Sequence, residues 1–295
     1  VTALQEKYFN AIYTRNVVEI KKCLEKGVNP NALSPIGLAP LHVLAERDDC
    51  VLGYRLMTHS DNIDLDLLSA HGYTALHVAC LFSNKKFAVM LLQMGADPNK
   101  RDRFNKTALH IAVLRVDYSL IYNLLKYNAD VNVMDCFENT PLSISLVQEP
   151  NLLIAKMLCK HKPDMDLENH KSTLHVFFVC HTINQIEFVM LLLDNGIDIN
   201  FSDKLSGRIC LHFVAISGYL ELAVVLVEKG ADLRAIDKTL RTPTKIAMDH
   251  GNVIIADYFQ KGYRPPNLIT ALPLVTKWLK KVKKRVAERK AAEQQ

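Results

Sequence analysis

A short phrase recurs along this 295-residue chain at an almost constant interval. It reads GYTALHVA at 72–79 and NKTALHIA at 105–112, and weaker copies read LAPLHVLA, NTPLSISL, KSTLHVFF, RICLHFVA and RTPTKIAM. Counted between equivalent residues from Ala39 to Thr242, the steps are 35, 33, 33, 32, 37 and 33 residues. A period of this length predicts stacked units that cover one another's apolar faces, rather than one closed core.

A second phrase follows the first at a nearly fixed offset. It reads GADPN at 95–99, NADVN at 128–132, GIDIN at 196–200 and GADLR at 230–234, with weaker copies at 27–31, 60–66 and 162–166. Two markers in phase on this period resemble the ankyrin repeat, a unit of one β-turn and two antiparallel helices. The resemblance covers roughly residues 4 to 262.

The resemblance implies an all-α ankyrin-repeat solenoid of stacked helix-turn-helix units with β-turn fingers. We expect about eight helix pairs and no strand-rich core. The expected division is an N-terminal capping repeat at 1–33, the solenoid at 34–264, and a Pro-Pro linker with a basic amphipathic helical tail at 265–295.

The residues at the helix ends favour the same unit. The Thr or Ser in most copies of the first phrase is suited to cap the first helix, and the Pro that follows in some copies suits its first turn. Gly95, Gly196 and Gly230 follow the second helix, where a left-handed cap costs glycine little, and Asn128 takes that place in another unit.

Two sets of polar residues have both a catalytic and a structural interpretation. The histidines at positions 42, 77, 110, 175 and 212 occur once per unit, which separates neighbours by about 10 Å in a stack of helices. The resemblance implies that each one hydrogen-bonds between neighbouring turns. Asp97, Asp130 and Asp198 suit turns held by side-chain to backbone hydrogen bonds, rather than a paired acid and base.

The remaining composition points away from catalysis. The seven cysteines include no CxxC pair, and most lie in helical segments as small apolar residues, which suits a reducing compartment. No phosphate loop, metal cluster or nucleophile–base–acid set is recognisable, so we expect no enzyme, cofactor or metal. The longest apolar stretch, 209–227, breaks into two helices and is not a membrane span. With no visible signal peptide, we expect an intracellular, cytoplasmic protein.

The resemblance implies that the binding surface is the concave side, formed by the β-turn fingertips and the first helices. Phe104 and Phe137 fall on neighbouring fingertips, where a solvated loop is usually polar, and exposed aromatics beside Arg and Lys are favoured at interfaces. The alternative is that each ring folds back onto its own stack. The fingertip residues predicted to bind a partner are His71, Tyr73, Arg103, Phe104, Lys106, Phe137, Asn139, Leu205 and Arg208.

Positions at the ends of the first helices add a second predicted contact surface. An apolar residue stands at the first of two usually polar positions in five consecutive units, which would form an apolar ribbon suited to a segment of another protein. The predicted contact residues here are Leu81, Phe82, Leu114, Arg115 and Val147. Packing between helices explains the same residues equally well.

The C-terminal tail differs in charge from the rest of the chain. Residues 274–295 hold eight Lys or Arg and two Glu, a net of +6, whereas the other 273 residues hold 28 basic and 29 acidic side chains. Val275, Leu279, Val282 and Val286 lie at i, i+4, i+7 and i+11, which predicts a basic amphipathic helix. The residues predicted to bind through this tail are Trp278, Leu279, Lys280, Lys281, Lys283, Lys284 and Arg285.

Four interpretations of the tail stay open: binding to an anionic membrane, binding to calmodulin, a nuclear import signal, and docking on the last repeat. Nucleic-acid binding is disfavoured because the solenoid has no basic excess. Residues 271–282 also resemble the cullin-contacting end of a SOCS box, although no Cys lies upstream at 256–270.

These patterns predict a non-enzymatic scaffold or adaptor that binds a segment of a partner protein. One alternative is a substrate adaptor of a ubiquitin ligase, acting through the tail. The other is the ankyrin domain of a membrane-associated or channel-type protein.

Overall fold

The computed structural model describes residues 2–60, 62–147, 150–167 and 185–261. Fifteen α-helices and no β-strand occur in these ranges, as expected for an all-α repeat protein. The chain divides into two compact units, Val1–Asp164 and Met165–Gln295, and each is described by itself.

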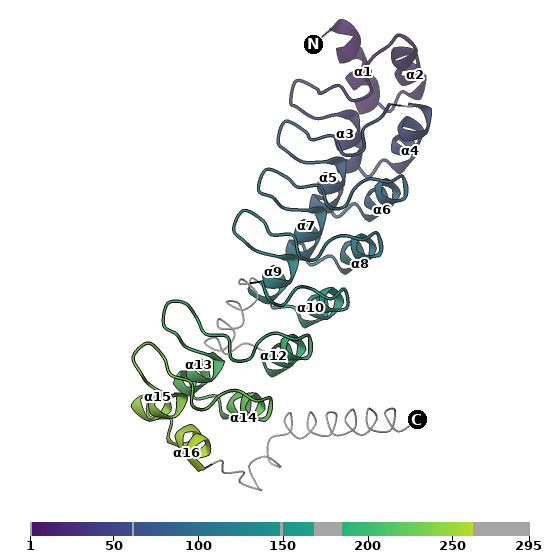
Figure 1. Cartoon of the computed structure of the whole chain (residues 1–295). Helices are drawn as coiled ribbons and strands as arrows, with labels where there is room; N and C mark the ends of the chain where they lie inside the picture. Colours follow the sequence, from purple (N-terminus) through teal and green to yellow (C-terminus); the bar gives the residue numbers. More distant parts are fainter. Residues whose placement is uncertain (1, 61, 148–149, 168–184, 262–295) are drawn as a thin grey trace, which may run out of the picture. The chain divides into compact units, whose positions relative to one another are not determined.

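The first unit consists of five helix pairs (Figure 1). The first helix of each pair stands in one row, the second helix in a parallel row, and long turns project away from the row of first helices. The pairs are α1 (Ala3–Tyr13) with α2 (Val17–Glu25), α3 (Pro40–Glu46) with α4 (Cys50–His59), α5 (Ala75–Leu81) with α6 (Lys85–Gln93), α7 (Ala108–Leu114) with α8 (Tyr118–Lys126), and α9 (Pro141–Val147) with α10 (Leu152–Cys159).

The second unit repeats the same construction. Its described helices are α12 (Gln185–Asp194), α13 (Cys210–Ser217), α14 (Leu220–Glu228), α15 (Pro243–Asp249) and α16 (Val253–Lys261). The two complete pairs, α13 with α14 and α15 with α16, bring the described total to seven pairs, together with α12. None of the helices in the described ranges is long and apolar enough to cross a bilayer.

The core of each unit lies where neighbouring pairs meet. Leu76 and Leu109 on first helices, and Phe87, Leu91 and Leu124 on second helices, are at most 1% exposed. Their spacing of three or four residues places them on one side of each helix. Each pair therefore buries its apolar face only when its neighbour is present.

The predicted helix caps are confirmed. Thr74 and Thr242 accept hydrogen bonds from the backbone N–H of His77 and Lys245, which satisfies an N–H group at the start of the helix. At the opposite ends, Gly95, Gly196 and Gly230 adopt φ angles of 96°, 96° and 93°, and Asn128 adopts 63°.

The phrase histidines join neighbouring repeats, as the resemblance implied. In His77, Nδ1 accepts a hydrogen bond from the backbone N–H of Thr74 at 3.2 Å. Its Nε2 therefore donates, and the acceptor is the carbonyl oxygen of Lys106 in the next repeat, 3.0 Å away. His42, His110 and His212 make the equivalent contacts to the carbonyl oxygens of Tyr73, Asn139 and Arg241. His175 lies outside the described residues.

The turn carboxylates also have the predicted structural role. The Oδ1 atoms of Asp97, Asp130 and Asp198 accept from backbone N–H groups two residues further on, at 2.8 to 2.9 Å. The side chain of Asn99 then joins two turns, because it accepts from the N–H of Asp130 and donates to the carbonyl of Asn128. A second set of hydrogen bonds thus links consecutive turns that follow the second helices.

Candidate functional site

The turns that project from the first helices form the candidate binding surface, and we call each of them a finger. Each finger within the described ranges is a five- or six-residue hairpin closed by a backbone hydrogen bond between its ends. In finger 102–106, the Oδ1 of Asp102 accepts from the N–H groups of Phe104 and Lys106, both at 2.8 Å. Asp135 holds Phe137 and Asn139 in the same way at 2.9 Å. The carboxylates therefore help fix the shape of these two fingers, and the hydroxyls of Ser34 and Ser69 accept a comparable bond in fingers 34–38 and 69–73.

The tips of these fingers carry exposed apolar side chains. Phe104 is 51% exposed and Phe137 is 70% exposed, so neither ring is buried in its own stack. Ile36 occupies the equivalent place on the first finger and is 60% exposed. Sequence reasoning missed Ile36, although counting back three residues from Ala39 would have found it. In the second unit, the side chain of Leu205 is 90% exposed.

Three pairs of neighbouring fingers are joined by backbone hydrogen bonds near their tips. The backbone N–H of Ala70 donates to the carbonyl of Gly37, and that of Cys136 donates to the carbonyl of Phe104, each at 2.8 Å. In the second unit, the N–H of Lys238 donates to the carbonyl of Ser206. The exposed side chains therefore stand on a braced row of turns, which lowers the ordering cost of binding.

Gly72 and Arg103 show how closely two fingers approach each other. Gly72 has a φ of 80°, and a Cβ placed on it would collide with Cγ of Arg103. The aliphatic part of Arg103 thus lies over the preceding finger, while the residue as a whole is exposed. His71, at the tip of that preceding finger, is also exposed.

Four other predicted finger residues have contacts within the scaffold. Tyr73, Lys106 and Asn139 are half-buried, and their carbonyl oxygens are the acceptors of the phrase histidines. The Nε of Arg208 lies 3.4 Å from Oδ2 of Asp237 on the next finger, and the Arg208 side chain is 23% exposed. These backbones and this ion pair hold the fingers in place.

The ends of the first helices form the floor beside the fingers. Leu81 and Leu114 are half-buried, whereas Phe82 is 54% exposed and Arg115 is exposed. Val147 is the last residue of α9, and its side chain is not among those described. The apolar ribbon predicted from the sequence is therefore partly accessible at Leu81 and Leu114.

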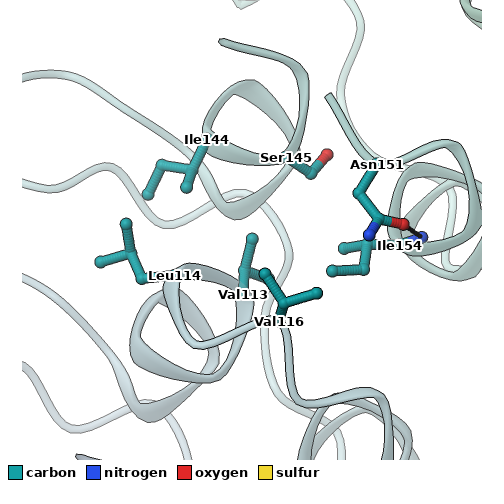
Figure 2. A pocket seen from close by; sticks show the side chains of 7 residues that line it. All are labelled: Val113, Leu114, Val116, Ile144, Ser145, Asn151 and Ile154. Carbon is teal, nitrogen blue, oxygen red and sulfur yellow. Dashed lines mark hydrogen bonds between the residues drawn. The ribbon is translucent and has the colours of Figure 1, made fainter. Parts of the chain in front are cut away.

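Leu114 also lines a pocket of about 300 Å³ between α7, α9 and α10 (Figure 2). The other lining residues are Val113, Val116, Ile144, Ser145, Asn151 and Ile154. The Ser145 hydroxyl donates to the carbonyl of Leu142, and Oδ1 of Asn151 accepts from the N–H of Ile154. These two side-chain groups are thus engaged within the fold, and the lining of the pocket is mixed, with both polar and apolar surface.

Burial sets the protonation of the ionisable groups behind this surface. It lowers the pKa of His42, His77, His110 and His212, because a charged imidazole is poorly solvated there. Burial also raises the pKa of the Cys80 and Cys159 thiols to about 12, which keeps both protonated at neutral pH. No group of three or more His, Cys, Asp or Glu side chains among the described residues could hold a metal ion.

The predicted tail-binding residues, 278–281 and 283–285, lie outside the described residues. The proposed contacts of the tail therefore stay predictions from the sequence.

Comparison with known proteins identifies the class to which this architecture belongs. A family model for ankyrin repeats matches three times, at residues 9–102, 109–203 and 176–266. The chain is thus a member of the ankyrin-repeat family. Ankyrin repeats are protein–protein interaction domains, and the chain contains such a domain.

Three proteins illustrate what the chain is similar to. It is 26% identical over 265 residues to human SH3 and multiple ankyrin repeat domains protein 2, covering 90% of this chain and 12% of that protein. It is 30% identical over 93 residues to the I-Kappa-B like protein C2 of Microplitis demolitor bracovirus (isolate Webb), covering 31% of this chain and 51% of that protein. The chain therefore spans about an eighth and about half of these two relatives. Among solved structures, the ankyrin repeat domain of Bcl-3 matches with a TM-score of 0.62 and 24% identity, over 74% of this chain and 98% of that one, which supports the fold.

Proposed function

We propose that the fingers and the adjoining ends of the first helices in the first unit bind a segment of a partner protein. The observation that carries the proposal is the placement of Phe104 and Phe137. They occupy the same position on consecutive fingers and are 51% and 70% exposed. Large aromatic side chains on a rigid support are the residues that most often dominate binding energy at interfaces.

The groove floor supports the same proposal. Phe82 follows α5 and is 54% exposed, and the half-buried Leu114 borders the pocket beside α7. A bound segment that crosses the fingers can place an apolar side chain against these residues. Because the fingers are already joined by hydrogen bonds, little ordering of the domain is needed on binding.

The role of the domain in a larger assembly rests on sequence alone. A scaffold or adaptor role follows from the ability to bind a partner segment, and we propose it for that reason. We also propose, from the sequence alone, that the protein is located in the cytoplasm. Ubiquitin-ligase and membrane-associated or channel-type roles depend on the tail or on further domains, and they stay predictions.

Affinity capture from cell extract tests the proposed surface. The full chain is compared with the double variant Phe104→Ala with Phe137→Ala, and with Tyr122→Ala as a matched control. Tyr122 is 62% exposed and lies on the second helix α8, away from the fingers. We expect captured proteins to be lost from the double variant, with an affinity loss of about 2 kcal/mol or more, and to be retained by the control.

The melting temperature separates this outcome from a structural effect. It should change little in the double variant, because both rings are exposed. If the double variant keeps all captured proteins, the fingertips are not the binding surface. If it instead loses its fold, the rings belong to the core and the proposal is wrong.

A further inference from the structure

The aspartates of the fingers are used internally, which leaves the outward charge of finger 102–106 positive. Asp102 and Asp135 accept backbone hydrogen bonds in the first unit, and Asp203 and Asp237 do so in the second. These aspartates hold the hairpins in shape. The charged residues that remain for a ligand are mostly basic.

The positive charge is concentrated around Phe104. Residues 100–106 read KRDRFNK, with four basic side chains and the single structural acid Asp102. Arg103 is exposed on the finger at 102–106, Arg101 is exposed just before it, and Arg115 is exposed at the end of α7 in the same repeat. The neighbouring finger at 69–73 carries no Lys or Arg, and neither does the finger at 135–139.

Some basic side chains in the described part of the chain are already paired with carboxylates. Arg15 pairs with Asp49, Lys85 with Asp117, and Arg208 with Asp237. Among the described residues, neither Arg103 nor Arg115 forms an ion pair. The stem of Arg103 is nevertheless supported by its contact over Gly72, which reduces the entropy lost when its guanidinium binds a ligand.

We infer that the partner segment is acidic and also carries apolar side chains. Its carboxylates pair with Arg103 and Arg115, and its apolar side chains pack on Phe104 and Phe137. This inference rests on the proposed function and adds the chemistry of the partner. Guanidinium groups suit carboxylates because they can form two parallel hydrogen bonds.

A protein segment explains this surface better than a nucleic acid does. Nucleic-acid binding requires a series of cations along the phosphate backbone. Here the basic finger has neighbours without Lys or Arg, and the finger at 135–139 includes Glu138. The exposed rings of Phe104 and Phe137 instead match a ligand that carries its charge at one place and apolar side chains beside it.

Selection from a library of random 12-residue peptides displayed on phage tests the inference, with the full chain as bait. The basic tail also attracts acidic peptides, so phage retained by the Phe104→Ala, Phe137→Ala variant are removed first. Selected peptides are then measured with Arg103→Glu, Arg115→Glu and with a control, Arg55→Glu, Lys126→Glu. The control makes the same change in net charge at exposed residues of the second helices α4 and α8.

We expect the selected peptides to combine a net negative charge with aromatic or aliphatic residues. Their affinity should fall about ten-fold with the Arg103→Glu, Arg115→Glu variant, because two exposed attractions become repulsions. The control variant should bind them within about two-fold of the original chain.

Three outcomes would overturn the inference. If the selected peptides are neutral or basic, or bind the Arg variant equally well, the proposed surface stands but the partner is not acidic. If no peptide distinguishes the original chain from the Phe104→Ala, Phe137→Ala variant, the proposed function fails as well. If the Arg103→Glu, Arg115→Glu variant binds a 20-base-pair DNA duplex more weakly than the original chain does, but binds the peptides equally well, the arginines recognise a phosphate backbone.

Discussion

The Nε2 atom of His77 lies 3.0 Å from the carbonyl oxygen of Lys106, so α5 is hydrogen-bonded to the finger that precedes α7. The imidazole is 1% exposed, and its Nδ1 is occupied by the N–H and hydroxyl of Thr74. One side chain thus closes the start of its own helix and holds the next repeat.

Replacing His77 by Ala should therefore weaken the stack. The change leaves buried groups without partners and opens a cavity, which costs about 2 to 4 kcal/mol of unfolding free energy. Urea denaturation of the full chain measures the loss. His71→Ala is the matched control, since that side chain is exposed at a fingertip and should cost less than about 0.5 kcal/mol. Equal effects of the two substitutions would contradict the bridging role.

The stability of the fold should fall as the pH drops below about 6.5. Burial lowers the pKa of His42, His77, His110 and His212 in the folded state, while the unfolded chain titrates near pH 6.5. Above that pH, both states are neutral at these positions and the stability is complete. Below it, the unfolded state binds more protons, so the unfolding free energy decreases towards the lower folded pKa values.

Denaturation at a series of pH values between about 7.5 and 5 checks this expectation. Most carboxylates titrate below this range and do not contribute to the change. The variant His77→Asn removes one of the buried imidazoles and should show a shallower dependence on pH. A stability that is constant or increases on acidification over this window would refute it.

A third prediction concerns the left-handed residues after the second helices. Gly95 has a φ of 96°, and no neighbouring atom obstructs a Cβ there, so only backbone strain opposes a side chain. Gly95→Ala should cost about 1 to 2 kcal/mol. Asn128→Gly, at the equivalent cap with a φ of 63°, should change the stability by less than about 0.5 kcal/mol. Thermal denaturation of both variants measures the two costs. If Gly95→Ala is as stable as the original chain, the prediction is wrong.

The tail provides a fourth prediction that follows from charge alone. If residues 274–295 bind an anionic membrane, the contribution is about 1 kcal/mol per basic residue near the surface, and salt screens it. Binding of the full chain to vesicles containing phosphatidylserine should then decrease steeply as salt is added. Trp278, the single tryptophan of the sequence, should shift its emission to the blue on binding. Emission that is already blue and does not respond to vesicles or calmodulin indicates docking on the last repeat instead.

The repeat architecture was predictable because each marker acts within one unit. Thr74, Gly95 and Asp97 have roles fixed by hydrogen bonds to residues close in sequence, so their spacing alone predicts the caps and turns. The sequence placed Phe104 and Phe137 on the fingers but left open whether each ring is exposed or folds back, and in the structure both are exposed.

The remaining details of the site depend on how one repeat approaches the next. The Arg208–Asp237 pair joins residues 29 apart, and the contact of Arg103 with Gly72 depends on the separation of two fingers. The pocket beside Leu114 likewise requires the relative positions of α7, α9 and α10. No local pattern in the sequence specifies these distances.

The histidine bridges also determine where the chain can be cut and rejoined. Deleting residues 74–106 removes His77 and its acceptor Lys106 together, and it leaves the bond from His42 to Tyr73 and the bond from His110 to Asn139 with both partners present. A deletion of the same length shifted by half a repeat would instead remove Lys106 and His110, so that His77 would have to pair with the carbonyl of Asn139 across a hybrid repeat. The interchangeable module of this protein therefore runs from one capping residue to the next, and repeats grafted from a relative should be joined at those residues.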